Sequence, residues 1–356
     1  MENNDNPQEA DAHSPSRMEA LMKNCKLQKN KEEVKQRLVQ SGTDFILVFW
    51  KVLSALEENI QSNADVSVAT LMAYMAEVLH CIFFLGHIHE MPINPKTFFQ
   101  NDRLFQIFKR QFPEPFEHYS THLPKRTPFS ILLDMVSKVK GHTDHRTILS
   151  QVEEVKKKLT EKSKDNQFVN NYSLTASVIC MSYFCTPEKG FNYGASLSCS
   201  GKVETKIMIA LSCIKTWNDA VAHAVCHAKK GGFIKFPDGV TCQAYIYDLK
   251  SGYNIEKAPC KKCHGMFRNV NFLPPPSEWP KGQDWQYGNC AETESLSHLL
   301  NTEQNVRNAI KAFKTHEVII NREEIVQEAK KNVTQLLNSR KFRIQLDDFK
   351  FFAVQN

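Results

Sequence analysis

Three cysteines and one glutamate form the clearest chemical pattern in the chain. Cys260 and Cys263 lie in the stretch APCKKC, and Cys290 and Glu292 lie in GNCAE. The proline of the first stretch is typical of the first turn of a helix, and the asparagine of the second is typical of an N-cap. Both stretches are therefore expected to begin helices, where exposed amide groups and the helix dipole stabilise thiolates.

Three thiolates that converge on one cation would form a zinc site with one position open. Catalytic zinc sites typically have three protein ligands and a water, whereas structural sites close with a fourth protein ligand. Zinc lowers the pKa of its water from about 15.7 toward about 7, and a neighbouring carboxylate can then move protons. The pattern predicts Zn²⁺ on Cys260, Cys263 and Cys290, with Glu292 as acid and base in a hydrolytic deamination.

These stretches resemble the two motifs of the zinc-dependent cytidine deaminase superfamily. Cys-Ala-Glu stands at residues 290–292 and Pro-Cys-x-x-Cys at residues 259–263, in the reverse of the family's usual order. In that superfamily a His or Cys and two Cys hold zinc, and the Glu shuttles protons, on a helix-strand-helix unit packed against a mixed sheet. The resemblance covers about residues 170–300. It implies a nucleobase as substrate, either as a nucleoside or in single-stranded nucleic acid.

Each stretch also has a simpler interpretation. Asn289 and Glu292 match a capping box, which satisfies helix amides without any chemistry. Cys260 and Cys263 also fit a pair of free thiols or a redox pair. If His264 supplied a fourth ligand, the zinc would be structural. The alternative function is then a non-catalytic interaction or scaffold protein with a structural zinc on a deaminase-like domain.

Two further patterns are weaker. HAVCH places His223 and His227 on one helix face, as in zinc proteases, but Ala224 stands where those enzymes have their catalytic Glu. The loop between the two cysteine motifs contains aromatic residues that fit either one wall of a base-stacking pocket or ordinary loop packing: Trp279, Trp285 and Tyr287.

The elements that must position these residues change character along the chain. From about residue 31 to 164, apolar residues recur at steps of three and four, which predicts helices. Beyond residue 170, four short runs rich in β-branched and aromatic residues predict strands: SVICMSYF, NYGASLSC, KIMIALSC and TCQAYIYDL. WNDAVAHAVCHAKKGG predicts a helix capped at Asn218 or Asp219.

The predicted fold class is α+β or α/β. An N-terminal all-helical domain is followed by a deaminase-like mixed sheet flanked by helices and by a helical C-terminal tail. The predicted boundaries are a disordered segment at 1–30, the helical domain at 31–167, the α/β domain at 168–303 and a C-terminal helical extension at 304–356.

Composition limits the class of protein. The 356 residues are enough for two domains and a core without disulfides, and a net charge of +6 permits a nucleic-acid partner without requiring one. The first twenty residues have no apolar stretch of the secretory kind, which predicts a cytoplasmic or nuclear protein whose cysteines are mostly reduced. Glu77 and His80 interrupt the apolar stretch 66–86, so it is predicted to be a buried helix and no membrane partner is expected.

Overall fold

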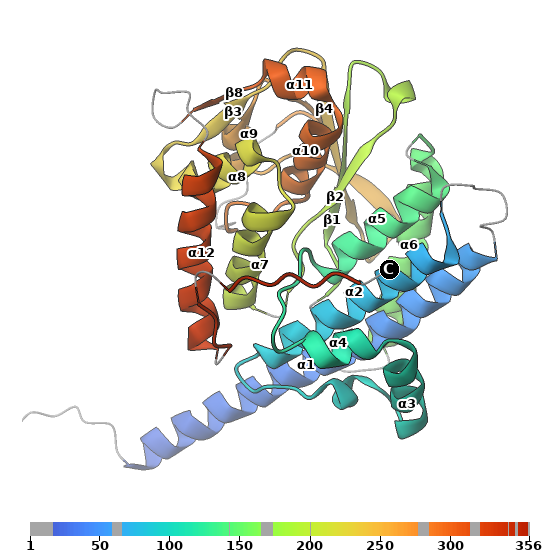
Figure 1. Cartoon of the computed structure of the whole chain (residues 1–356), viewed down its shortest axis with the longest axis vertical. Coiled ribbons are helices and arrows are strands. Elements are labelled where there is room, and N and C mark those ends of the chain that lie inside the picture. The colour runs from blue at the N-terminus through green and yellow to red at the C-terminus, as the bar shows by residue number, and fades with distance from the viewer. Residues whose placement is uncertain are drawn as a thin grey trace, which may run out of the picture.

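The computed structural model describes most of the chain, and it confirms the predicted fold class. The described residues are 17–58, 66–141, 143–164, 174–199, 201–276, 285–313, 321–340, 342–345 and 348–354. An N-terminal helical half lies beneath and beside a sheet that is flanked by further helices, and the C-terminal part is again largely helical (Figure 1). Residues 1–16 and 165–173 lie outside the described ranges, and the predicted domain boundary between residues 167 and 168 lies within the second of these segments.

The helical half contains long helices that pack on one another and shorter ones at its edge. In chain order they are α1 (Arg17–Glu57), α2 (Val68–His87), the 3-10 turn Pro95–Phe98, α3 (Asp102–Gln111), α4 (Pro113–His118), α5 (Pro128–Lys140) and α6 (His145–Lys164). Because α1 begins at Arg17, helix extends into the 1–30 segment for which the sequence predicted disorder.

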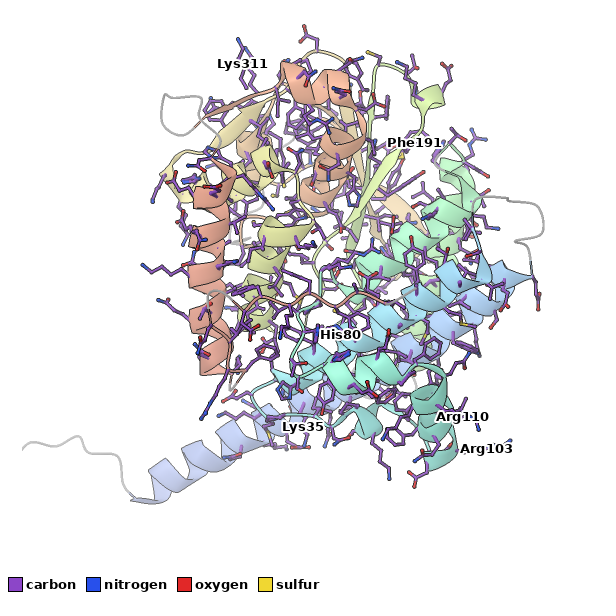
Figure 2. The ribbon with its side chains drawn as sticks, in the orientation of Figure 1. Lys35, His80, Arg103, Arg110, Phe191 and Lys311 are labelled. Atoms are coloured by element: carbon purple, nitrogen blue, oxygen red, sulfur yellow. The ribbon has the colours of Figure 1, made fainter. Side chains whose placement is uncertain are left out.

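Helix α2 is the apolar stretch that the sequence predicted as a buried helix. By length and composition it is the kind of helix that could cross a membrane, with a mean hydropathy of 1.8, and 67% of its most apolar window is buried inside the protein. Its Glu77 forms an ion pair with Arg126 at 3.0 Å, and its His80 stacks on the ring of Phe352 at 4.1 Å. Burial lowers the pKa of His80 to about 3. Figure 2 shows His80 inside the helical half.

The second half is built on a mixed five-stranded sheet. Its strands are β1 (Val178–Phe184), β2 (Asn192–Ala195), β4 (Val240–Tyr247), β5 (Asn254–Lys257) and β7 (Asn271–Leu273). The order is β2-β1-β4-β5, with β7 parallel to β4 and the other pairs antiparallel. A smaller sheet has the order β6-β3-β8, from β6 (Phe267–Arg268), β3 (Phe233–Lys235) and β8 (Lys311–Phe313).

One predicted strand is wrong. KIMIALSC lies within helix α7 (Lys202–Lys215), which buries Ile207, Met208, Leu211 and Ile214. These positions recur at steps of one, three and three, which is the spacing of one helix face, so the helical period prevails over the β-branched content of the run. The next helix, α8 (Asp219–His227), begins as predicted, because the side chain of Asn218 accepts a hydrogen bond from the amide of Ala220.

Helices α9 (Lys261–Met266) and α10 (Ala291–Thr302) carry the two cysteine motifs. Helix α10 packs closely on β1 and β2, and Gly194 makes this approach possible. A Cβ at Gly194 would lie 2.3 Å from the amide nitrogen of Ser295 and 2.5 Å from the carbonyl oxygen of Ala291. The Ser295 hydroxyl donates to the carbonyl of Asn192 at 2.8 Å, and its oxygen lies 2.8 Å from the Ser182 hydroxyl. Backbone contact and hydrogen bonds therefore fix α10 on the sheet.

The C-terminal part joins the two halves. It contains α11 (Gln304–Ala309), β8 and α12 (Arg322–Ser339), followed by an extended tail. The tail crosses to the helical half, where the amide of Leu123 donates to Lys350 and that of Phe352 donates to Leu123. Buried apolar residues of both halves form one continuous cluster. The core thus extends from the helices to the sheet without a break.

Candidate metal centre

Cys260 and Cys263 lie at the start of α9, directly after the β4–β5 hairpin. Cys260 lies at the helix N-terminus as predicted, but as the N-cap residue, so Pro259 precedes the helix and is not in its first turn. The sulfur of Cys260 accepts a hydrogen bond from the Cys263 amide at 3.4 Å. The sulfur therefore occupies the position where a helix end stabilises negative charge. Cys263 is buried, whereas Cys260 is partly exposed.

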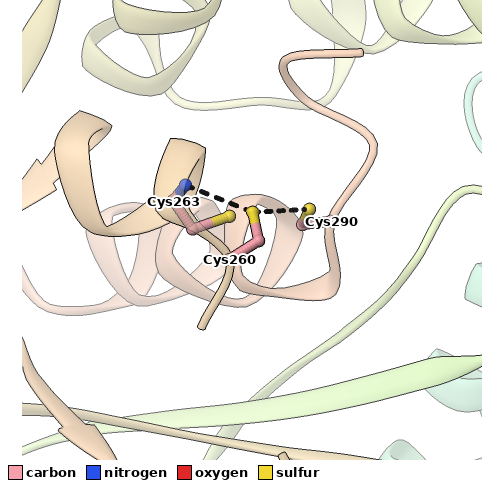
Figure 3. A group of neighbouring side chains, drawn as sticks. All are labelled: Cys260, Cys263 and Cys290. Atoms are coloured by element: carbon pink, nitrogen blue, oxygen red, sulfur yellow. Dashed lines mark hydrogen bonds between the residues drawn. The ribbon is translucent and has the colours of Figure 1, made fainter. Parts of the chain in front are cut away.

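Cys290 lies at the start of α10, beside the first pair. Its sulfur is 3.5 Å from that of Cys260 (Figure 3). Cys290 itself is the N-cap of α10, where the sequence predicted Asn289, and its side chain makes no capping hydrogen bond. The predicted capping box is therefore wrong: the carbonyl of Asn289 accepts from the amide of Leu197, which anchors the residue to the end of β2.

The three sulfurs have a spacing suited to a soft metal ion. All lie within 4.8 Å of one another. Tetrahedral zinc with sulfur at about 2.3 Å requires sulfurs about 3.8 Å apart, so small side-chain rotations suffice to close the site. Among the described residues this is the one group of three or more His, Cys, Asp or Glu side chains with ligand atoms so close together. The chemistry of a three-thiol set fits zinc.

Hydrogen bonding within the group favours the thiolate form of Cys260 over those of its two neighbours. Hydrogen bonds from the Cys263 and Cys290 thiols lower the pKa of Cys260 to about 2. The hydrogen bond to Cys260 raises the pKa of Cys263 and that of Cys290 in turn. A divalent cation favours ionisation of every ligand, so metal binding would release the remaining thiol protons.

Glu292 lies beside the sulfurs and is almost wholly buried, with 4% of its surface exposed. Burial raises the pKa of its carboxyl to about 7, and the charge of Cys260 adds to the rise. A hydrogen bond with Cys263 and the charge of Lys257 act in the opposite direction. The structure thus brings together all four residues predicted from the sequence, Cys260, Cys263, Cys290 and Glu292.

The histidines near the motifs do not join the group. His264 is exposed on the first turn of α9, with its ring 6.2 Å from that of Phe272. His223 and His227 are buried on α8 with ring centroids 4.5 Å apart, and the Nε2 of His227 lies 3.7 Å from Glu328. Neither set belongs to the close group of ligand atoms, so a fourth ligand from His264 is not seen among the described residues.

The loop before Cys290 is tied to α9. The Lys262 ammonium donates to the carbonyl of Trp285 and lies 4.7 Å from the centre of the Tyr287 ring. Trp285 is 55% exposed. Trp279 lies outside the described residues, so the predicted base-stacking wall stays a prediction.

Sequence reasoning missed two cysteines beneath the site. Cys180 on β1 and Cys242 on β4 are buried with sulfurs 3.2 Å apart. Burial, the hydrogen bond with Cys180 and the charge of Glu292 raise the pKa of Cys242. Each cysteine lies on the core face of a correctly predicted strand, but their closeness follows from the pairing of β1 with β4, which the sequence does not show.

No family model, curated protein or solved structure matches this chain. The resemblance to the cytidine deaminase superfamily therefore rests on the two motifs and stays a prediction. The possible metal-binding group rests on the geometry of the three sulfurs. The identity of the metal and the reaction belong to the proposal that follows.

Proposed function

We propose that the protein is a zinc-dependent hydrolytic deaminase acting on a nucleobase, in a nucleoside or in single-stranded nucleic acid. The observation that carries the proposal is the position of Glu292, a buried carboxyl beside three clustered thiols. A purely structural Cys site has no need of a buried carboxyl at its side, and a buried carboxyl without a charged partner costs stability.

The residues have distinct roles in this reaction. Cys260, Cys263 and Cys290 would hold zinc, which supplies a Lewis acid that lowers the pKa of a water at its open position. Glu292 would take a proton from the attacking water and pass it to the ring nitrogen. The Glu292 carboxyl would then assist protonation of the leaving amine, so that the amine and water yield a carbonyl group and ammonia.

The environment of Glu292 suits a group that both accepts and donates protons. A general acid and base is most effective when its pKa is near the working pH, and burial raises the pKa of Glu292 to about 7. The partial exposure of Cys260 and Cys290 leaves one side of the sulfur group open to a substrate.

The direct test is an assay of zinc-loaded protein with cytidine and with a cytosine-containing single-stranded oligonucleotide, measuring ammonia and the deaminated base. Glu292→Gln is expected to keep the zinc and lower turnover by roughly 10²- to 10⁴-fold, the usual contribution of general acid and base catalysis. Glu303→Gln, at the C-cap of the same helix, removes the same charge and is the matched control.

The alternative, a scaffold protein with a structural zinc, gives different results. It requires about one zinc per chain, no deamination of either probe, and an unfolded region in Cys260→Ser protein. Zinc binding without turnover would therefore reject the enzyme and keep the metal site. Protein that binds no zinc would reject both functions.

A further inference from the structure

A second site lies on the other side of α10, between the helical half and the sheet. A cavity of about 350 Å³ opens there. Its walls come from α2, α5, β2 and α10, with Tyr74, Asp134, Tyr193, Glu294 and His298 among the lining residues. The volume lies within the range of about 300–1,000 Å³ that is typical of pockets for small ligands. Glu294 is two residues after Glu292, roughly 200° around the helix, so the cavity is separate from the sulfur group.

The most deeply buried carboxyl that lines the cavity is Glu294, a residue that is 8% exposed. One carboxylate oxygen, Oε2, accepts from the Ala195 amide at 2.7 Å and from the Ser130 hydroxyl at 3.0 Å. Both donors are uncharged. The other oxygen, Oε1, has no hydrogen-bond partner among the described residues, although the side chain lines the cavity.

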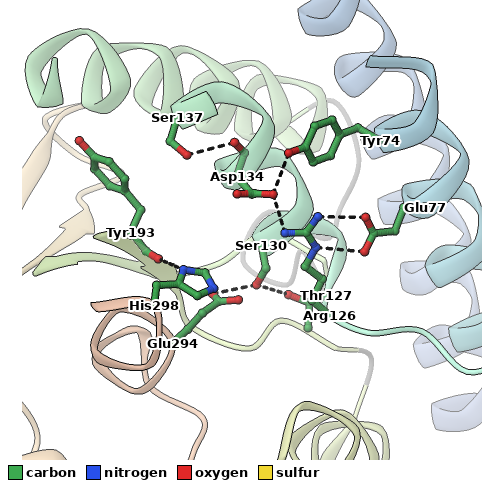
Figure 4. A network of polar contacts seen from close by, with 10 residues as sticks. All are labelled: Tyr74, Glu77, Arg126, Thr127, Ser130, Asp134, Ser137, Tyr193, Glu294 and His298. Atoms are coloured by element: carbon green, nitrogen blue, oxygen red, sulfur yellow. Dashed lines mark hydrogen bonds and ion pairs between the residues drawn. The ribbon is translucent and has the colours of Figure 1, made fainter. Parts of the chain in front are cut away.

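Asp134 faces the same space from α5 (Figure 4). Its Oδ2 accepts from the Tyr74 hydroxyl at 2.8 Å and from Arg126 at 2.7 Å. Arg126 also binds both oxygens of Glu77 at 3.0 Å, so one guanidinium serves two carboxylates. Together with Glu294, the network around the cavity has more negative than positive groups at its inner end.

His298 adds a further acceptor. Its Nδ1 lies 2.7 Å from the carbonyl oxygen of Tyr193. A carbonyl only accepts, so Nδ1 carries a proton, and Nε2 presents a lone pair whenever the ring is neutral. Figure 4 shows His298 and Glu294 on one side of the network and Asp134 with Ser137 on the other.

The outer end of the cavity is different. Exposed polar side chains surround its mouth: Lys138, Asn301 and Thr302. A cationic N–H group suits the carboxylates of Glu294 and Asp134, whereas the exposed ammonium of Lys138 makes the mouth unsuited to a second cation. The acceptors at the inner end are not gathered closely enough to count as a metal group, since the cysteine group alone meets that spacing among the described residues.

We propose that this cavity binds a small organic cation, an alkylammonium or alkylguanidinium, between Glu294, Asp134 and His298. A guanidinium has N–H groups on several edges and can bind acceptors that lie further apart than the ligands of one metal ion, whereas an ammonium can bind only some of the three, and either cation matches the carboxylates of Glu294 and Asp134. Cation binding in the cavity requires neither zinc nor turnover, so this proposal can be tested independently of the deaminase proposal.

Calorimetric titration with n-butylguanidinium and n-butylammonium tests the proposal, with n-butylurea as the neutral isostere. The wild-type protein is expected to bind at least one of the two cations saturably and to bind n-butylurea at least about tenfold more weakly. Glu294→Gln is the most informative variant, because its amide oxygen can keep both bonds to Ala195 and Ser130 while an amide N–H₂ replaces Oε1. It is expected to weaken cation binding by roughly 10- to 100-fold.

Glu303→Gln removes the same charge beyond the end of α10 and is expected to bind like the wild type. If circular dichroism shows that Glu294→Gln is misfolded, Asp134→Asn takes its place, since its carbonyl can still accept from Tyr74. The proposal is overturned if neither cation binds saturably, if n-butylurea binds equally well, or if folded Glu294→Gln or Asp134→Asn binds like the wild type.

Discussion

Two buried carboxyl groups on opposite faces of α10 have different surroundings. Glu292 lies against three sulfurs, where burial raises the pKa of its carboxyl to about 7. Glu294, on the other face, receives two hydrogen bonds from Ala195 and Ser130, which hold one of its oxygens in place. The difference shows how one short helix can present a proton-exchanging group on one side and a fixed acceptor on the other, because the donors around each carboxyl decide its chemistry.

Metal removal is expected to separate the two faces most strongly. If the three thiols bind zinc in the folded protein as proposed, a zinc concentration about 1,000 times the dissociation constant would add about 4 kcal/mol to the free energy of unfolding. Denaturant titrations with zinc and with a chelator measure this difference. Cys260→Ser is expected to abolish it, whereas Cys185→Ser, at an exposed free cysteine, is expected to preserve it.

Cation binding in the cavity should survive the chelator, because no sulfur lines that cavity. A chelator that abolished n-butylguanidinium binding would show that the two faces are one coupled site. Stability unchanged by zinc would show that the three thiols do not form a metal centre.

Gly194 supports both faces, since it lets α10 approach the sheet. Gly194→Ala would place a Cβ 2.3 Å from a backbone nitrogen, and backbone atoms cannot rotate away. We expect a loss of about 3 kcal/mol in unfolding free energy, with weaker zinc and cation binding together. Gly265→Ala in α9 is the matched control, because its Cβ would have nothing within 4 Å.

A Gly194→Ala protein with unchanged stability would mean that α10 can shift without cost. Loss of zinc binding with cation binding intact would mean that only the sulfur face of α10 depends on how closely the helix packs on the sheet.

The sequence could predict the face of α10 beside the three sulfurs but not the face that lines the cavity. The first depends on residues close together in the chain, and the second depends on residues far apart in it. Cys260 and Cys290 are at helix starts that cap residues mark locally, and Glu292 follows in the first turn. Even there both helices begin later than predicted, since Pro259 precedes α9 and Cys290, not Asn289, is the N-cap of α10. The convergence of the two helices comes from sheet pairing, for which short motifs contain no information.

The cavity depends on contacts between distant residues. Ser130 and Glu294 are 164 positions apart, and Tyr74 and Asp134 are 60 apart. No spacing of residue types in the sequence indicates that Asp134 and His298 line the same cavity. The misassigned helix α7 has a related cause: its β-branched residues favoured a strand, whereas packing on α8 and α12 selects the helical face.

Lys156 is a buried basic residue, and it can be compared with the two buried carboxyl groups of α10. It is 1% exposed on α6, and its ammonium donates to the carbonyl of Ser177 at a long 3.4 Å. Burial lowers the pKa of Lys156 to about 7, while Glu153 opposes the shift. Between about pH 7 and 10 the unfolded chain therefore binds more protons at this residue than the folded protein, so its contribution to stability rises with pH.

The corresponding variant is Lys156→Met, which keeps an apolar stem of similar length. Relative to this variant, the wild-type free energy of unfolding is expected to increase by roughly 3 kcal/mol from pH 7 to pH 9.5, measured by urea titration. Lys158→Met, at a partly exposed position on the same helix where the ammonium pairs with Glu154, is the control. If the free energy of unfolding changed with pH in the same way for wild type and Lys156→Met, the lowered pKa of Lys156 would be contradicted.

The smallest expected effect concerns the reason for a carboxylate at residue 294. If Glu294 served only to bind Ala195 and Ser130, an amide oxygen would serve as well, and Glu294→Gln should change the free energy of unfolding by less than about 1 kcal/mol. Glu294→Ala should cost about 1–3 kcal/mol, because it leaves a buried amide and hydroxyl without their acceptor. Urea titrations of both variants without any added cation measure the two values.

A small change in Glu294→Gln, together with weaker cation binding, would show that the negative charge is dispensable for folding and is used by a ligand. A large loss of stability in Glu294→Gln, equal to that of Glu294→Ala, would instead assign the charge to the packing of the two halves. The comparison of the two faces would then become one between a reactive carboxyl and a purely structural one.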